Sequence, residues 1–284
     1  MPEGHTLHRL AGALSTVFGG HRVHAGSPQG RFADGAARVD GTRLVDADAW
    51  GKQLFVRFEH ELFVHVHLGL YGTFDVHDDV ETVPAPVGQV RLRLVRPAST
   101  GQLPAYADLR GANRCALVTA EERDAVLARI GPDPLRADAD PERAWARISA
   151  SSAPIGTLLM DQPVLAGVGN VYRAEVLFRH RIHPLRPGRS LRPSQWRAIW
   201  DDLVVLMGEG VLSGRIDTVR PEHLPEAMGR APRVDDHGGE VYVYRRTGQP
   251  CHVCARPVRT QVLGGRNLFW CARCQPVFRS RAGR

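Results

Sequence analysis

The first residues of the chain combine a possible amine nucleophile with a possible proton donor. If the initiator Met1 is removed, Pro2 presents a free secondary amine, and Glu3 places a carboxyl group directly beside it. The dipole of a helix and nearby cations lower the pKa of such an amine and leave more of it free to attack. The same residues also suit an ordinary helix start. The N-terminus therefore predicts amine catalysis only if the rest of the chain supports it.

Four cysteines near the C-terminus form a second chemically capable group. They make two Cys-x-x-Cys pairs with 16 residues between them, a spacing typical of a zinc ribbon or finger. Four thiolates close the tetrahedral shell of zinc and leave no position for water, which predicts one structural Zn²⁺. The expected ligands are Cys251, Cys254, Cys271 and Cys274, and Cys115 is left over as a core-filling residue.

The composition indicates a globular protein that favours polyanionic partners. The chain has 284 residues, of which 43% are hydrophobic, and a formal net charge of +7. Residues 251–284 contain seven arginines and no acidic residue, and Lys52 is the only lysine of the chain. No apolar run has the length of a membrane span, and no signal-peptide pattern is present, so we expect a cytoplasmic protein without a membrane partner.

The elements that position these groups change type along the chain. Apolar residues at helical spacing from Leu7 to Phe18 predict a helix that carries the N-terminus. Short runs then predict a β-sandwich or barrel, with strands at 43–46, 54–58, 62–68, 90–95 and 116–119. In the run 62–68, His65 and His67 alternate with the apolar residues. Such a pair is expected to be ordinary polar residues on an exposed face, with metal ligation as the alternative.

The second half of the chain is predicted to be helical after a linker rich in Pro and Asp. Helices are expected at 141–150, 155–160 and 171–180 and around Trp196, followed by a loop at 208–240 with little regular structure. The turn at 161–170 contains Gly167 and Gly169, whose backbone can approach a phosphate at a helix start. It is not a dinucleotide fingerprint, because it lacks a third glycine and follows a helix. Asn170 suits either a phosphate contact or a helix cap.

Taken together and in this order, the motifs resemble the formamidopyrimidine-DNA glycosylase and endonuclease VIII family of base-excision repair enzymes. The resemblance covers nearly the whole chain, and its specificity comes from the combination of motifs. They lie at residues 1–4, 51–52, 67–72, 131–135, 161–170 and 243–250 and at the four cysteines.

The resemblance implies a fold, an activity and a partner. The fold class is α+β and multidomain: an N-terminal helix and β-sandwich form a catalytic domain at 1–130. A helix-two-turns-helix DNA-binding domain follows at 131–240 and a zinc finger at 241–284. The activity is that of a bifunctional DNA glycosylase and AP lyase that forms an N-terminal proline iminium and cuts the strand by β,δ-elimination. The partner is damaged DNA, bound by a monomer that is nucleoid-associated in the complex.

The resemblance also assigns roles to single residues. Pro2 would attack C1′ of the sugar, and Glu3 would assist ring opening by transferring a proton to O4′. Lys52 would contact a DNA phosphate near the damaged nucleotide. Asn170 and Arg266 would clamp the backbone on both sides of the lesion.

Extrusion of the damaged base leaves a gap in the duplex that side chains must fill. Leu70 and Tyr71 match the intercalating positions of endonuclease VIII-like members, and Arg110 would reach the orphaned base. Packing at a strand turn is an equal alternative for these residues. The chain departs from the family pattern at His5-Thr6, where many members have Pro-Glu, and at Gly111-Ala112, which replaces an aromatic wedge.

These departures leave the lesion open. Gly4 and the Leu70-Tyr71 pair favour oxidised pyrimidines, and an enzyme for oxidised purines is the alternative within the family. A non-catalytic zinc-finger DNA-binding protein would keep the phosphate contacts without the chemistry. A zinc-ribbon protein that binds RNA or the ribosome would explain the basic C-terminal region but not the N-terminus.

Overall fold

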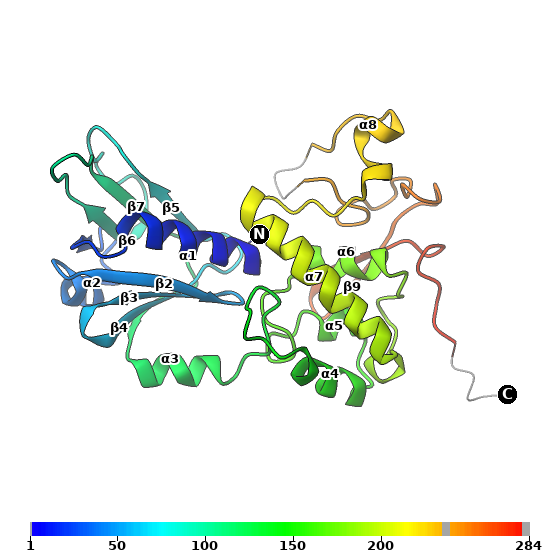
Figure 1. The fold of residues 1–284 in the computed structure, drawn as a ribbon. Coiled ribbons are helices and arrows are strands. Elements are labelled where there is room, and N and C mark those ends of the chain that lie inside the picture. Colours follow the sequence, from blue (N-terminus) through cyan, green and yellow to red (C-terminus); the bar gives the residue numbers. More distant parts are fainter. Residues whose placement is uncertain (1, 235–238, 280–284) are drawn as a thin grey trace. The chain divides into compact units, whose positions relative to one another are not determined.

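A computed structural model describes residues 2–234 and 239–279 of the chain. The chain divides into two compact units, Met1–Arg129 and Ile130–Arg284 (Figure 1). Within the described ranges, no helix has the length and hydropathy that crossing a membrane requires.

The first unit is a β-sandwich with a helix across it. The helix α1 (Gly4–Phe18) packs against β2 and β3 and buries Leu7, Leu14 and Phe18. One antiparallel sheet has the order β2 (Leu44–Trp50), β3 (Gln53–Phe58), β4 (Leu62–His67) and β8 (Arg114–Val118). The other has the order β1 (His24–Gly26), β6 (Val90–Arg96), β7 (Ala105–Arg110) and β5 (Thr73–His77). The predicted sandwich is therefore confirmed.

Three short helices complete this unit, namely α2 (Ala33–Val39), η1 (Glu59–Glu61) and α3 (Ala120–Leu127). The helices α2 and α3 and the strands β1, β5 and β7 were not predicted from the sequence. The apolar residues of these elements are sparse and interrupted by charged residues. Neither the helical period of 3.6 residues nor the strand period of two is therefore strong in the sequence. The helix α3 begins with a capping box, in which Thr119 and Glu122 satisfy each other's backbone N–H groups.

The outer face of β4 differs from the prediction. Val64 and Val66 face the sandwich core, as expected from the alternation. The opposite face was predicted to be exposed, but Phe63 is buried in a second cluster with residues of α3, and His65 is only 3% exposed. His65 is therefore a buried polar residue, for which hydrogen-bond partners are required.

The second unit contains four helices of the predicted region, α4 (Pro141–Ala150), α5 (Ile155–Leu158), α6 (Asn170–Arg179) and α7 (Pro193–Ser213). A short η2 (Gly188–Ser190) lies before α7, and the hairpin of β9 (Arg259–Leu263) and β10 (Arg266–Trp270) follows later in the chain. The bounds of α4 agree with the prediction. The loop expected at 208–240 is shorter, because α7 continues to Ser213 and η3 (Pro221–His223) and α8 (Pro225–Met228) follow.

The finger and the helices share one core. Val258 and Phe269 of the finger belong to the same buried cluster as Tyr172 of α6 and Trp196 of α7. Gln275 also donates from Nε2 to the carbonyl of Ile182 at 2.9 Å. The segments 131–240 and 241–284 thus lie within one compact unit.

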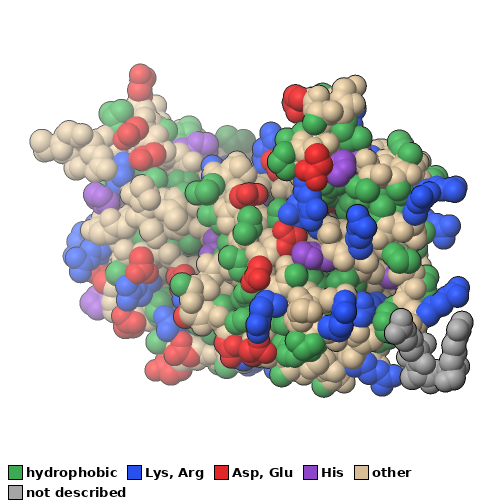
Figure 2. All heavy atoms as spheres, turned by 45° about the vertical axis from the view of Figure 1, so that its right-hand side comes forward, with side chains coloured by type: hydrophobic (Ala, Val, Ile, Leu, Met, Phe, Trp, Pro, Cys, Tyr) green, Lys and Arg blue, Asp and Glu red, His purple; other side chains and the backbone are tan. Residues whose placement is uncertain are grey.

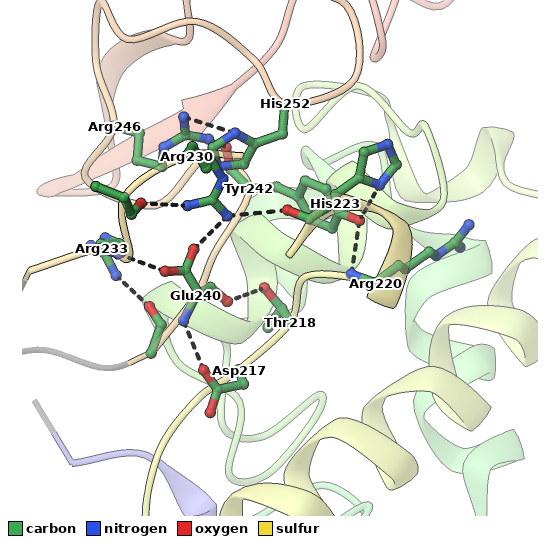
Figure 3. A network of polar contacts seen from close by, with 12 residues as sticks. Asp217, Thr218, Arg220, His223, Arg230, Arg233, Glu240, Tyr242, Arg246 and His252 are labelled. Atoms are coloured by element: carbon green, nitrogen blue, oxygen red, sulfur yellow. Dashed lines mark hydrogen bonds and ion pairs between the residues drawn. The ribbon is translucent and has the colours of Figure 1, made fainter. Parts of the chain in front are cut away.

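A polar network replaces regular structure in the segment that follows α7 (Figure 3). Glu240 accepts from Nη2 of Arg230 and from the backbone N–H of Arg233, each at 2.6 Å, and its own N–H donates to Asp217 at 2.7 Å. The hydroxyl of Tyr242 accepts from the N–H of Arg220 at 3.0 Å. These bonds stabilise a chain segment that few ladder or helix bonds support.

Candidate active site and nucleic-acid interface

Pro2 and Glu3 lie immediately before the first helix. Because α1 begins at Gly4, Glu3 occupies the N-cap position, and Pro2 precedes the helix instead of starting it. The Glu3 side chain is fully buried and makes no capping hydrogen bond to the helix. Helix capping therefore does not explain Glu3, which leaves a buried carboxyl group next to the candidate amine. Met1 lies outside the described residues.

His5 follows in the first turn of α1. Burial lowers the pKa of His5 to about 4, so its imidazole is neutral near pH 7. Its Nε2 lies 3.3 Å from the hydroxyl of Thr6. At Thr6, the position where many family members carry an acid, this chain has a hydroxyl beside the neutral imidazole of His5.

Lys52 lies in the tight turn between β2 and β3, after Gly51 in a left-handed conformation with φ of 58°. Burial lowers the pKa of His67, and the charge of Lys52 lowers it further. From the sequence, His67 was expected to be an ordinary polar residue. The pairing of β3 with β4 places His67 near this turn, because Leu54 pairs with Val66 and the next residues along the two strands are Gln53 and His67.

Leu70 and Tyr71 lie at the tip of the turn between β4 and β5. The N–H of Gly72 donates to the carbonyl of Leu68 at 3.1 Å and closes this turn. Leu70 is 36% exposed and Tyr71 is 88% exposed. A side chain that packed at the turn would be covered, so the packing alternative does not describe Tyr71.

Arg110 is held on the sheet surface. Its guanidinium donates to Asp75 at 3.0 Å, to Asp108 at 2.8 Å and to the carbonyl of Val87 at 3.1 Å. A reach into DNA requires these bonds to open first.

In the second unit, the structure brings Asn170 next to the strand that carries Arg266. Asn170 is the first residue of α6 and not its cap, which is Gly169. Its Nδ2 donates to the carbonyl of Asn267 at 3.0 Å, and its Oδ1 accepts from Nε of Arg173 at 2.9 Å. The turn before α6 and the finger hairpin are thus directly linked.

Gln162 shapes the turn that precedes Asn170. Its Oε1 accepts from the N–H of Gly167 at 3.0 Å, and its Nε2 donates to the carbonyl of Val168 at 3.0 Å. Gly167 has a φ of 85°, which favours glycine. The sequence does not single out Gln162, because a polar residue in a loop has no periodic signal.

The four predicted zinc ligands converge. The Sγ atoms of Cys251, Cys254, Cys271 and Cys274 all lie within 4.8 Å of one another. Two of these pairs are 3.8 and 3.4 Å apart, close to the roughly 3.8 Å that four Zn–S bonds of about 2.3 Å impose in a tetrahedron. The donor set fits one Zn²⁺. Burial raises the pKa of Cys115 to about 12, in line with its expected role as a neutral core residue.

The finger displays its basic residues to solvent. Arg266 directly follows the turn Gly264-Gly265, in which both glycines have positive φ, as a two-residue hairpin turn requires. Figure 2 shows Lys and Arg side chains as separate groups on one face of the molecule, most of them towards its right-hand side. The exposed arginines of the finger region are Arg256, Arg259, Arg266, Arg273 and Arg279. Arg281 and Arg284 of the basic region lie outside the described residues.

The predicted site residues divide between the two units. Pro2, Glu3, Lys52, Leu70, Tyr71 and Arg110 belong to the first, and Asn170, Arg266 and the four cysteines to the second.

Comparison with protein families gives three matches along the chain. The N-terminal domain of formamidopyrimidine-DNA glycosylase matches residues 1–115, and the H2TH domain of the same enzyme matches residues 130–220. A zinc finger found in FPG and IleRS matches residues 248–277.

Individual relatives match over most of their length. Endonuclease 8 1 of Mycobacterium tuberculosis is 52% identical over 280 residues, which cover 97% of this chain and 100% of the relative. Formamidopyrimidine-DNA glycosylase of Thermus thermophilus is 32% identical over 242 residues, 84% of this chain and 85% of the relative.

Solved structures share the fold. The crystal structure of MutM (FPG) from Thermus thermophilus matches with a TM-score of 0.73 and 27% identity, covering 96% of this chain and 98% of that one. A complex of the Lactococcus lactis Fpg with DNA containing an abasic site matches with a TM-score of 0.74, covering 97% and 100%. Its identity of 18% supports the fold alone.

Proposed function

Because the chain belongs to the formamidopyrimidine-DNA glycosylase and endonuclease VIII family, we propose that it removes oxidised pyrimidines from DNA through an iminium on Pro2. Family membership makes it a DNA glycosylase of base excision repair with AP lyase activity. The observation that carries the proposed chemistry is the buried Glu3, which lies next to Pro2 and does not cap its helix.

The proposed reaction uses Pro2 as nucleophile and Glu3 as proton donor. The lone pair of the free Pro2 nitrogen forms a bond to C1′, and the bond between C1′ and the base breaks with its electrons leaving on the base. The proton that the Pro2 nitrogen then loses balances the charge of the departing base and restores the nitrogen lone pair. Proton transfer from Glu3 to O4′ opens the sugar ring and leaves an iminium at C1′. The iminium acidifies the C2′ proton. Loss of that proton expels the 3′ phosphate, and a second elimination expels the 5′ phosphate.

The proposed DNA contacts come from both units. Lys52 supplies an ammonium group for a phosphate near the lesion. Asn170 and Arg266 hold further phosphates, supported by the hydrogen bond between Asn170 and the backbone of Asn267. The zinc ion has a structural part in this proposal, because its four ligands hold the hairpin that carries Arg266.

The exposed turn at Leu70 and Tyr71 suits the filling of the gap that an extruded base leaves. Insertion of Tyr71 requires no local unfolding, because its side chain is already in solvent. We also propose that Arg110 contacts the orphaned base. Unlike Tyr71, it must first release its ion pairs with Asp75 and Asp108.

The proposed preference for oxidised pyrimidines over oxidised purines rests on the similarity of this chain to its relatives. The chain is 52% identical to a protein named Endonuclease 8 1 and about 30% identical to proteins named formamidopyrimidine-DNA glycosylase. The turn residues Leu70 and Tyr71 point the same way. We further propose that the protein acts as a monomer in the cytoplasm and associates with the nucleoid through DNA.

Reductive trapping tests this function. Duplexes that each carry one oxidised pyrimidine, one oxidised purine or one abasic site are incubated with the protein and borohydride. The expected result is a covalent adduct, formed fastest with the pyrimidine lesions. A matched protein with an N-terminal extension, in which the Pro2 nitrogen is an amide, should bind DNA and form no adduct. Absence of an adduct with a free Pro2 on every substrate would support the non-catalytic alternative.

A further inference from the structure

A row of polar side chains crosses one end of the sheet β2-β3-β4-β8 on its outer face. The register pairs His67 of β4 with Arg114 of β8 and sets Gln53 of β3 beside His67. Residues that pair across neighbouring strands point to the same face, so these three side chains share it. Lys52, in the turn before Gln53, lies at the same end of the sheet.

The buried imidazole of His65 connects two members of this row. Its Nε2 lies 2.7 Å from Oε1 of Gln53, and its Nδ1 accepts a hydrogen bond of 2.8 Å from Nε of Arg114. An arginine Nε can only donate, so Nδ1 is the acceptor and Nε2 carries the proton. The ring also stacks on Phe55, with a centroid distance of 4.5 Å and an interplanar angle of 17°. Three contacts therefore fix the orientation of this ring.

His65 holds Arg114 without neutralising its charge. Burial lowers the pKa of His65 to about 4, and the charge of Arg114 contributes to the shift, so the imidazole is neutral near pH 7. Arg114 is exposed, and its two Nη groups have no hydrogen-bond or ion-pair partner among residues 2–234 and 239–279. Arg110 differs from Arg114 in this respect, because the carboxylates of Asp75 and Asp108 offset the charge of Arg110.

A guanidinium that is oriented at Nε and open at both Nη groups has the geometry of an anion receptor. Two parallel N–H groups match two oxygens of a phosphate, and prior fixation of the side chain reduces the entropy lost on binding. Gln53 and Arg114 are separated by two strand spacings, roughly 10 Å. The cations of Lys52 and Arg114 are therefore suited to different phosphates of one DNA strand.

We propose that Arg114 is a further phosphate contact for DNA, next to the phosphate held by Lys52, and that His65 and Gln53 are its positioning residues. This inference rests on the proposed function, in that it takes damaged DNA as the ligand. It adds a contact that the motifs of the sequence did not indicate.

Salt dependence of DNA binding tests the contact. The affinity of wild type and Arg114→Gln for a duplex with an uncleavable abasic-site analogue is measured at several salt concentrations. Loss of one phosphate contact should make the slope of log K against log salt shallower by about 0.9. The matched control is Arg123→Gln, whose guanidinium lies over the ring of Phe63 at the other end of the same face. The control should keep the wild-type slope.

A double-mutant cycle tests the positioning role. His65→Phe keeps an aromatic ring against Phe55 but removes both hydrogen bonds, and it should weaken DNA binding several-fold when Arg114 is present. In the Arg114→Gln background it should have no further effect, because the group that it positions is gone. Gln53→Leu serves as the second variant if His65→Phe does not fold, as judged by thermal unfolding.

The outcomes separate this inference from the proposed function. An unchanged slope in Arg114→Gln, with wild type that binds and forms the borohydride adduct, overturns the phosphate contact alone. Equal effects of His65→Phe in both backgrounds overturn the positioning role alone. A wild-type protein that shows no salt-dependent DNA binding overturns the proposed function itself.

Discussion

Asn170 donates a hydrogen bond of 3.0 Å from Nδ2 to the backbone carbonyl of Asn267, 97 residues further along the chain. Arg173 donates to Oδ1 of the same amide and lies 3.4 Å, through Nη2, from the same carbonyl. Since Asn267 directly follows Arg266 in β10, the turn before α6 and the basic hairpin are held at a defined separation. Two phosphate contacts proposed from distant motifs thereby belong to one rigid arrangement.

Replacement of Asn170 by alanine should both weaken DNA binding and destabilise the fold. The buried Arg173 loses one acceptor, which costs about 1–3 kcal/mol of unfolding free energy. Binding loses the Asn170 amide and the fixed position of Arg266, so we expect an affinity lower by about tenfold or more, since each 1.4 kcal/mol is a factor of ten. Fluorescence anisotropy with an abasic-analogue duplex measures this, and an unchanged affinity would contradict the clamp.

Glu3→Gln should slow excision strongly while binding persists. The amide keeps the size of the side chain but cannot deliver the proton to O4′, and loss of such a group costs roughly 10²–10⁴ in rate. Single-turnover excision gives the rate, and gel-shift binding gives the affinity. Glu81→Gln, at an exposed site, is the control and should retain full activity. Wild-type excision by Glu3→Gln would remove Glu3 from the mechanism.

Zinc removal should unfold the finger and release DNA. Closed four-cysteine sites contribute directly to folding free energy, and here the finger shares its core with the helices of the second unit. Cys251→Ser should therefore lose bound zinc and most of its DNA affinity, whereas Cys115→Ser should keep both. Zinc content and anisotropy are measured on the same samples. Undiminished affinity in a metal-free protein would defeat the structural role.

Glu175→Gln should destabilise the second unit. The buried carboxylate accepts from the N–H groups of Tyr242, Val243 and Tyr244 at 2.6–2.8 Å. Hydrogen bonds to a charged group contribute about 1.5–3 kcal/mol each, so a loss on the order of 3 kcal/mol is expected. Thermal unfolding measures it, with the exposed Glu209→Gln on α7 as the control. A melting temperature equal to that of the control would contradict the prediction.

Acid should destabilise the fold through buried histidines. Burial holds the pKa of His65 at about 4, below the 6.5 of an unfolded chain. Between these values the unfolded state binds more protons, so stability falls as pH decreases from 6.5 to 4, by about 1.4 kcal/mol per pH unit for each such histidine. His65→Phe removes one such group, so the slope of stability against pH should fall by about 1.4 kcal/mol per pH unit in this range. Urea unfolding at pH 7, 6 and 5 measures it, and an identical slope in the variant would refute the assignment.

The sequence by itself determined the features that depend on local pattern. The α1 helix, the strands with strong alternation and the helix at 141–150 follow from the period of apolar residues, which is a local property. The zinc site follows from the spacing of four cysteines, because two Cys-x-x-Cys turns can bring four thiolates together in few ways. The combination of motifs identified the family before any geometry was known.

Tertiary structure decided what depends on contacts between distant segments. The spacing of residues cannot show that His65 is buried, because its strand face is covered by α3, whose own helical period is weak. It cannot show that Arg110 is paired and Arg114 open, because both are arginines on strands that follow each other in the chain, and the two strands join different sheets with different neighbours. Local pattern thus reveals which residues could act on DNA, whereas register and burial decide which of them keep an available charge.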